Sequence, residues 1–422
     1  MAADETDRLR KQENRTIVFE RRELFCATFL SPMFVSALLL SILVHNAWLR
    51  AAGCAGYFAA LTPIILAVML HFSHPTLHDF VARLFVAAGA TFEEAQVVAA
   101  SLVESNLRGY DSHGVLLARW YLGQIKNHEL VSGAPFTVLA DSPAFVAADG
   151  GLGFGQVQCA RLVDCVAAKA REHGTATGTM RRSGHVGRLG EWVERAAAAG
   201  LAALIAVNDN GVIRTVAPPG GTAGRLSTNP IAIGVPTGSG PLVLDISTSA
   251  VANGKLKVAR LEKRTVAPGL IQDAQGHPTT DPSVMIADPP GALLPFGGDQ
   301  AYKGFGLALL FDILIGGLSG GFCPPAPEGT IECNNILLVV WDPARFAGAA
   351  HFAAEANRLI QWIHETPRKA GVDRIQLPGD RSAAIRAQRL IEGIPLAEAV
   401  WEQLTRVAGK LRVEVPEGDG GR

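Results

Sequence analysis

Residues 183–207 read SGHVGRLGEWVERAAAAGLAALIAV. The glycines at the start predict a turn, residues 191–199 have the spacing of an amphipathic helix, and residues 201–207 are the apolar run of a buried strand. Short apolar runs at 231–235 and 242–246 predict two further strands. Strands that alternate with helices along a chain indicate an α/β or mixed α+β sheet domain.

Helical patterns flank this region. Apolar residues recur at three- and four-residue spacing from Thr76 to Gly89, which predicts a helix. Thr91 with Glu94 three residues later is a capping box for a second helix that ends near residue 107. The pattern also predicts a helix over 156–172, an apolar helix over 303–318, a buried strand over 335–341 and, from 381, two helices broken at 393–395.

The composition limits the classes of function that the chain can have. The chain has 422 residues, with 38 Lys and Arg against 39 Asp and Glu, so its formal charge is −1. A nucleic-acid-binding protein normally carries a basic excess, so this class is excluded. The length allows two or three domains. Apolar residues make up 48% of the chain and charged residues 18%, against about a quarter charged in ordinary soluble domains.

The apolar excess is concentrated in residues 24–49 and 51–70, which contain no Asp, Glu, Lys or Arg. Each stretch is long enough to cross a bilayer as a helix, and the arginines before them would lie in the cytoplasm. The extension is therefore a membrane hairpin, a targeting segment, or upstream sequence outside the working protein. A cleaved signal peptide fits poorly, because the apolar region is too long. Met69 begins ordinary soluble sequence, so we favour an internal start there.

The cysteines form no CxxC pair and no spacing of metal ligands, so no metal site is expected. We interpret them as buried apolar residues in a reducing compartment. They are Cys26, Cys54, Cys159, Cys165, Cys323 and Cys333.

Two stretches place a histidine where a ligand could meet it. The loop over 111–114 contains Ser112 and His113, and an imidazole in such a loop can act as a general acid or base. The glycine-rich stretch 183–190 precedes a helix, whose N-terminus favours an anion, and Arg188 could add a bidentate contact. An ordinary loop histidine and an ordinary glycine turn are the alternatives that these residues leave open.

Two more stretches place polar groups at the ends of predicted elements. Asp245 lies at the end of a strand, where α/β folds commonly hold ligand-binding groups. Lys303 and two glycines open the apolar helix and could contact a phosphate or ribose. A solvated strand-end carboxylate and a capped helix start are the alternatives.

One dinucleotide motif is absent from the sequence. The glycines at 151, 153 and 155 lack the G-x-G-x-x-G register because position 156 is Gln, and no acidic residue follows at the usual distance. A classical Rossmann site is therefore not expected.

The order of the motifs carries a resemblance to a known family. Along the chain stand DSHGV (111–115), DGGLGFGQ (149–156), SGHVGRLGEW (183–192), STNPI (227–231), VLDISTS (243–249), GHPTTDPSVM (276–285), YKGFGLAL (302–309) and LPGDR (377–381). This series resembles the malate/L-lactate dehydrogenase family of non-Rossmann NAD(P)-dependent oxidoreductases, and hydroxycarboxylate dehydrogenase B within it, over residues 75–411.

The resemblance implies an enzyme that interconverts a 2-hydroxy acid and a 2-oxo acid with NAD or NADP, in the cytoplasm and as a homodimer. His113 would be the catalytic acid/base, and Ser112 would orient it or the substrate. The residues implied for the substrate are Tyr121, Arg119, Arg188, Thr228 and Asn229. Those implied for the cofactor are His185, Gly187, Arg188, Leu189, Leu244, Asp245, Ile246, Lys303, Gly304 and Phe305.

The resemblance also implies a family-specific sheet domain for the cofactor and a second, helical catalytic domain built from both ends of the chain. We expect an extension over 1–70, the N-terminal part of the catalytic domain over 71–140, the cofactor domain over 141–325, and the C-terminal part of the catalytic domain over 326–422.

One position departs from the pattern. Many members have an arginine four residues after the histidine to hold the substrate carboxylate, and here that residue is Leu117. Arg119 or Arg188 could replace it. The alternatives kept open are a reductase of cyclic 2-carboxy imines and a membrane-anchored module without catalysis.

Overall fold

The computed structural model describes residues 69–417. The apolar stretch 24–49, nearly all of 51–70, and Cys26 and Cys54 lie outside the described residues. Met69 and Leu70, the last two residues of the second stretch, belong to strand β1 (Met69–Phe72).

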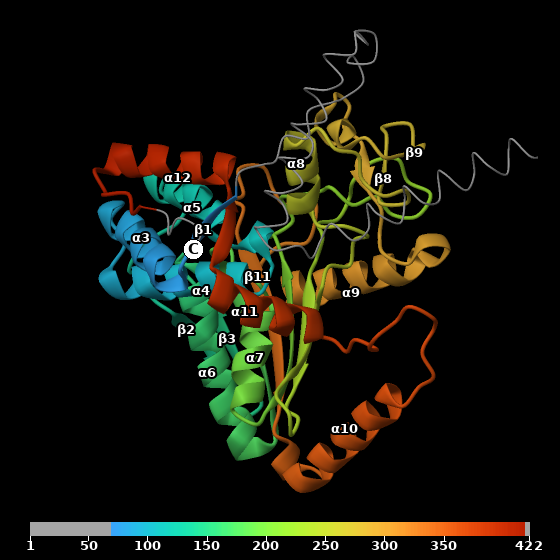
Figure 1. The fold of residues 1–422 in the computed structure, drawn as a ribbon. Helices are drawn as coiled ribbons and strands as arrows, with labels where there is room; N and C mark the ends of the chain where they lie inside the picture. The colour runs from blue at the N-terminus through green and yellow to red at the C-terminus, as the bar shows by residue number, and fades with distance from the viewer. Residues whose placement is uncertain (1–68, 418–422) are drawn as a thin grey trace, which may run out of the picture. The chain divides into compact units, whose positions relative to one another are not determined.

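A mixed seven-stranded sheet forms the centre of the molecule, in the order β2-β3-β4-β11-β5-β6-β7 (Figure 1). Only β3 and β4 run parallel, and every other neighbouring pair is antiparallel. This is not the parallel Rossmann sheet, which agrees with the missing fingerprint. The strands are β2 (Thr137–Asp141), β3 (Phe145–Asp149), β4 (Thr175–Ser183), β5 (Ala202–Asn208), β6 (Ile231–Val235), β7 (Leu242–Ile246) and β11 (Asn334–Trp341).

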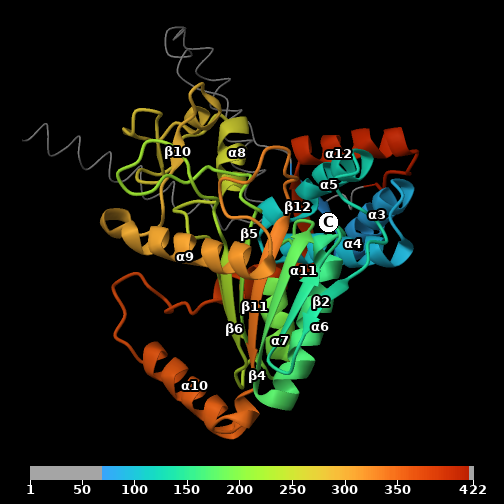
Figure 2. The same ribbon diagram turned by 180° about the vertical axis from the view of Figure 1, so that it is seen from behind.

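Helices cover both faces of this sheet because its strands are apolar on both sides. Along β5, Ala203, Ile205 and Val207 pack into the cluster that contains α6 (Gly155–His173) and α7 (Gly190–Ala198). Leu204 and Ala206, which point the other way, pack with Phe311 and Ile315 of α9 (Tyr302–Ser319). Figure 2 shows α9 crossing the sheet on the face opposite α6 and α7.

A second, helical unit joins the two ends of the described chain. Its apolar cluster draws on residues 72–130 and 394–413, and β1 pairs antiparallel with β12 (Ile394–Ala397). The rings of Phe72 and Trp401 lie 4.2 Å apart, centre to centre. The helices are α3 (His74–Ala87), α4 (Phe92–Leu107), α5 (Ala118–Lys126) and α12 (Glu398–Leu411). The predicted fold class, a mixed sheet domain with a helical domain from both termini, is confirmed.

The remaining elements lie outside these two cores. Helix α8 (Asn253–Leu261) and a small sheet share a separate apolar cluster. Helix α10 (Ala349–His364) has no buried residue and lies apart from the sheet in both views, and α11 (Asp380–Glu392) packs against α4 (Figures 1 and 2). The small sheet consists of β8 (Ile271–Gln272), β9 (Pro278–Thr279) and β10 (Ala292–Leu293).

Most predicted elements are confirmed within a residue or two, but two expectations change. The break predicted at 393–395 is strand β12, since residues 394–397 pair with β1. Strand β11, which the expected boundary at 326 assigned to the catalytic domain, lies between β4 and β5 in the central sheet. The division into segments otherwise stays a proposal.

Among residues 69–417, only α9 is long and apolar enough to cross a membrane. A core helix of a soluble protein passes the same test, and α9 packs against β5 and β11.

Candidate active site

The His113 loop is held from two sides. It forms a short 3₁₀ turn, Asp111–His113, directly after α4. From α4, Asn106 donates from Nδ2 to Asp111 Oδ1 at 2.7 Å and accepts the Val115 amide at 2.8 Å. Arg389 of α11 forms an ion pair with the same carboxylate at 2.7 Å. Ser112 Oγ lies 3.1 Å from His113 Nδ1, within hydrogen-bonding distance.

The glycine-rich turn brings a second histidine to the first. It follows β4, and Gly187 has φ +76°, a backbone conformation that favours glycine. Asn334 Oδ1 accepts the Val186 amide at 3.0 Å, which fixes the turn to β11. The rings of His113 and His185 are stacked with their centres 5.8 Å apart.

Tyr121 also lies in this cluster. Its side chain is buried, and its Oη lies 2.6 Å from His185 Nδ1. Gln156 donates from Nε2 to the same hydroxyl at 3.1 Å. Trp120 packs edge-on against His185, with the ring centres 5.5 Å apart. The structure therefore joins three predicted site residues, His113, Tyr121 and His185, in one group, in which Tyr121 is buried and the two histidines are half-buried.

Both histidines are neutral near pH 7. Burial, with the charge of Arg188, lowers the pKa of His113 to about 4. Burial, with the neighbouring His113, lowers the pKa of His185 to about 3. A neutral imidazole can accept a proton, so His113 is in the form that a general base requires.

Arg188 lies at this site as half of a buried ion pair. Its two terminal nitrogens donate to the two carboxylate oxygens of Glu194 at 3.0 and 2.7 Å. The guanidinium lies over the Tyr110 ring, 5.4 Å from its centre. Its Nε is buried and has no hydrogen-bond partner, so one donor remains for a ligand.

Asp245 meets the glycine-rich turn from β7. Its Oδ2 accepts the Gly190 amide at 2.8 Å, at the start of α7. Burial is the main cause that raises the pKa of Asp245 above its usual value. Of the two residues that flank it, Leu244 is half-buried and Ile246 is exposed. Leu189 is buried in the core beneath the turn.

Thr228 and Asn229 lie just before β6, and the Asn229 side chain is bonded to α9. The Thr248 amide donates to the Thr228 carbonyl at 3.0 Å. Asn229 donates from Nδ2 to Asp312 of α9 at 2.8 Å, while its buried Oδ1 has no partner. Asp312 also accepts from Asn208 at 2.7 Å.

Four predicted residues form no contact described with the histidine pair. Arg119 is exposed and donates to Gln403 of α12 at 3.3 Å, so it does not join the histidines. Lys303 is exposed at the start of α9, and Phe305 packs against the apolar cluster of α8. At Gly304 an added Cβ would lie 2.6 Å from the Phe296 carbonyl oxygen, so close packing requires this glycine.

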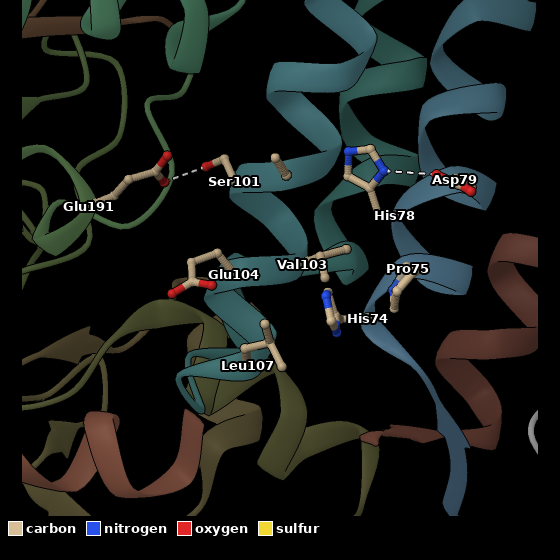
Figure 3. Close-up of a pocket in the computed structure, with 10 residues that line it drawn as sticks. His74, Pro75, His78, Asp79, Ser101, Val103, Glu104, Leu107 and Glu191 are labelled. Atoms are coloured by element: carbon tan, nitrogen blue, oxygen red, sulfur yellow. Dashed lines mark hydrogen bonds and ion pairs between the residues drawn. The ribbon is translucent and has the colours of Figure 1, made fainter. Parts of the chain in front are cut away.

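A separate cavity of about 520 Å³ opens between α3, α4 and the start of α7 (Figure 3). Ser101 donates to Glu191 there at 2.6 Å, and burial raises the pKa of Glu191 to about 7. The cavity is also lined by His74, His78 and Glu104. None of the residues predicted from the sequence lines it.

Two polar atoms of the predicted site residues could serve a nicotinamide dinucleotide or its substrate. Arg188 Nε and Asn229 Oδ1 are buried without partners, and a structure normally pairs such atoms. The first amides of α7 already donate to Asp245 and to the carbonyls of Arg188 and Leu189. Among residues 69–417, no group of three or more His, Cys, Asp and Glu side chains could hold a metal ion.

Three residues of this site were not assigned a role from the sequence. Gln156 contacts Tyr121, Glu194 binds Arg188, and Tyr110 lies under the guanidinium. The motif DGGLGFGQ contains Gln156, and its place at the start of a helix was the one available signal. Glu194 shows no local pattern that separates it from a solvated helix residue.

Two half-buried histidines stack beside a glycine-rich turn on a mixed, non-Rossmann sheet, an arrangement that an acid/base enzyme can use. The malate/L-lactate dehydrogenase family model matches residues 72–405. The chain belongs to the malate/L-lactate dehydrogenase family, and it is an oxidoreductase that requires a nicotinamide cofactor.

Individual relatives agree with this assignment. L-lactate dehydrogenase of Cupriavidus necator is 39% identical over 76% of this chain and 92% of its own length. Hydroxycarboxylate dehydrogenase B of Escherichia coli is 34% identical over 81% of this chain and 94% of its own. The crystal structure of the Δ1-piperideine-2-carboxylate reductase of Pseudomonas syringae is 34% identical, with a TM-score of 0.70 over 80% of this chain and 99% of its own. The predicted resemblance and enzyme class are confirmed.

Proposed function

We propose that the enzyme interconverts a 2-hydroxy acid and a 2-oxo acid at the His113–His185 pair. The observation that carries this proposal is the stacking of two neutral, half-buried histidines with ring centres 5.8 Å apart, one of them beside a hydroxyl. Hydroxy-acid oxidation needs a group that removes the hydroxyl proton while hydride leaves from the same carbon. His113 supplies that group.

The residues divide the work as follows. The nicotinamide supplies the hydride acceptor or donor. His113 Nε2 takes the proton from the substrate hydroxyl. For this, Nδ1 carries the ring proton and donates a hydrogen bond to Ser112 Oγ, 3.1 Å away. In reduction, the protonated His113 returns the proton to the carbonyl oxygen. We assign the cofactor to the turn over 183–190, to the end of β7 and to the start of α9.

We propose that Arg188 binds the substrate carboxylate. It would replace the arginine that many family members have at the position of Leu117. Its Nε–H is buried and free, whereas Arg119 is exposed and bonded to Gln403. A carboxylate in a dry pocket needs such a donor. Because both terminal nitrogens of Arg188 already bind Glu194, they are not available to a 2′-phosphate of the cofactor. This favours NAD over NADP.

The alternative is reduction of a cyclic 2-carboxy imine, which the name of the Pseudomonas relative supports. The imine nitrogen would then receive the proton from His113. The test is a panel of pyruvate, oxaloacetate, an aromatic 2-oxo acid and piperideine-2-carboxylate, each with NADH and with NADPH. We expect NADH oxidation with a 2-oxo acid. Turnover of the imine alone would replace the proposed reaction, and no turnover with any of the four would contradict it.

We also propose a cytoplasmic homodimer. Trp362 and Leu359 of α10 are 72% and 59% exposed, and Leu310 and Ile313 of α9 are 61% and 52% exposed. A helix such as α10, with an apolar side and no buried residue, requires a second protein surface. The described cysteines are all free, as in a reducing compartment. Light scattering should give twice the chain mass, and Trp362→Glu should weaken the association; a monomeric wild type would contradict the proposal.

A further inference from the structure

A row of hydrogen bonds ends at Nδ1 of His185 and leaves the other ring nitrogen, Nε2, free. The Gly187 backbone N–H donates to His185 Nδ1 at 3.3 Å. The Tyr121 hydroxyl lies 2.6 Å from the same nitrogen. Behind Tyr121, Gln156 donates from Nε2 to the hydroxyl oxygen at 3.1 Å. Among the described residues, His185 Nε2 forms no hydrogen bond.

Two donors set the direction of the bonds in this row. A backbone N–H can only donate, so the long Gly187 contact of 3.3 Å favours a bare Nδ1 on His185. The Gln156 amide occupies the Tyr121 oxygen, so Nδ1 has no acceptor for a proton of its own. The Tyr121 hydroxyl must then donate its only hydrogen to Nδ1, and its oxygen is left to accept. Gln156 offers the matching donor through its amide NH₂. A neutral ring with a bare Nδ1 has its proton on Nε2.

We propose that Gln156 is a positioning residue, which acts through Tyr121 to hold His185 as the Nε2–H tautomer and so presents a hydrogen-bond donor to the substrate oxygen. The inference rests on the proposed function for the identity of that oxygen. The two histidines then have different tasks: His113 exchanges the proton, and His185 donates a hydrogen bond to the oxygen that becomes or ceases to be a carbonyl.

Burial makes this arrangement stable. Gln156 is fully buried and Tyr121 is 1% exposed, so no solvent replaces either partner. A Tyr121 oxygen without the Gln156 amide would be a buried acceptor left unpaired, which costs about 1–3 kcal/mol. The same oxygen could regain a partner by accepting a hydrogen bond from a protonated Nδ1 of His185, and that bond requires the opposite tautomer of the ring.

The helix that carries Gln156 also provides a matched control. Gln158 lies two residues further along α6, is equally buried, and also has an unpaired Oε1. Its Nε2 donates to the Ala134 carbonyl at 3.0 Å instead of to the active site. Gln156→Met and Gln158→Met therefore remove the same amide from the same helix, and only the first touches Tyr121.

The experiment is nitrogen NMR of the full chain with ¹⁵N-histidine, in which the His185 signals are assigned by their loss in His185→Gln. We expect the wild type to show a bare Nδ1 and a protonated Nε2. Gln156→Met should add the Nδ1–H form, and Gln158→Met should leave both signals unchanged. Gln156→Leu, which removes the same amide, should reproduce the change, and it serves as the second variant if Gln156→Met does not fold.

Kinetics give an independent readout. Loss of a preorganised donor should lower kcat for the best 2-oxo acid about 100-fold in Gln156→Met, with little change in cofactor Kd. Wild-type nitrogen signals in Gln156→Met and Gln156→Leu, or an equal change in Gln158→Met, would overturn the proposal. Because the NMR signals need no substrate, an enzyme inactive on every 2-oxo acid would contradict the proposed function alone.

Discussion

At the scale of single residues, burial sets the working form of the site. His113 is kept neutral by its surroundings, with a pKa lowered to about 4, mainly by desolvation and then by Arg188. Oxidation of a 2-hydroxy acid needs this neutral ring, and reduction needs the protonated one. The pH dependence of the two directions should therefore have opposite signs.

The corresponding variant is His113→Ala. Without the acid/base, we expect kcat to fall about 10²- to 10⁴-fold in both directions, while the cofactor Kd, measured by fluorescence titration, stays the same. In the wild type, kcat/KM for oxidation should be level above about pH 5 and fall as the pH drops through 4. His277→Ala, at a side chain that is 77% exposed, is the control. Near-normal turnover in His113→Ala would remove this residue from the mechanism.

A second residue-scale prediction concerns the buried pair of Arg188 and Glu194, whose side chains are 2% and 14% exposed. Glu194→Gln leaves the guanidinium charge buried without its partner, and it also removes the contact to Arg108 at 3.3 Å. We expect the free energy of unfolding to drop by about 3–5 kcal/mol, measured by urea denaturation.

The chain offers a matched exposed pair. Arg195 also donates hydrogen bonds to both carboxylate oxygens of its partner, Asp164. The side chains of Arg195 and Asp164, however, are 50% and 60% exposed. Asp164→Asn should therefore change the free energy of unfolding by less than about 1 kcal/mol. Equal effects at the two pairs would show that burial does not decide the contribution of Glu194.

At the scale of elements, close contact between helices and the sheet determines how the site is held. Helix α6 carries Gln156 and packs on β4, which leads into the histidine turn. At Gly178 of β4 an added Cβ would lie 2.4 Å from Val166 Cγ2 and 3.0 Å from Leu162 Cδ1. This glycine allows the helix to approach the strand.

Gly178→Ala should therefore force α6 away from the sheet. We expect a loss of about 1–3 kcal/mol in the free energy of unfolding, visible as a lower Tm. The control is Gly123→Ala in α5, where an added Cβ meets no atom within 4 Å. Gly123→Ala should stabilise the protein by up to about 1 kcal/mol through helix propensity. If both variants unfold at the same temperature, the packing argument is wrong.

Element by element, the sequence predicted what depends on local pattern. The Thr91 cap was correct, since its hydroxyl accepts the Glu94 amide at 3.2 Å. Strands β6 and β7 were found because apolar runs between turns are distinctive. Strand β12 was not, because Gly393 and Pro395 are typical of a break, and only pairing with a strand from the opposite end of the chain makes the segment extended.

In the site, too, the sequence predicted single residues but not the contacts between them. His113 and His185 could be proposed from motifs, but their stacking, the Arg188–Glu194 pair and the Gln156–Tyr121 bond join segments between 6 and 72 residues apart in sequence. The His113–His185 and Gln156–Tyr121 contacts depend on how the helical unit meets the sheet, and the Arg188–Glu194 pair depends on how the turn bends back over the first residues of α7.

At the scale of the whole molecule, the described chain closes on itself through β1 and β12. Met69, Leu70, His71 and Phe72 each pair with a residue of β12, and Phe72 is fully buried against Trp401. This closure holds α12 beside α3 and α5. Loss of β1 would therefore loosen the unit that carries His113 and Tyr121.

Two shortened chains test this closure. A chain that begins at Met69 keeps all of β1, so we expect it to be soluble, dimeric and as active as the full chain. A chain that begins at Ser73 lacks β1, and the loss of Phe72 alone should cost about 3–5 kcal/mol. Thermal unfolding and NADH oxidation measured on both would decide. An inactive or insoluble Met69 chain would show that residues 1–68 are needed, and equal Tm values for the two would show that β1 contributes nothing to the fold.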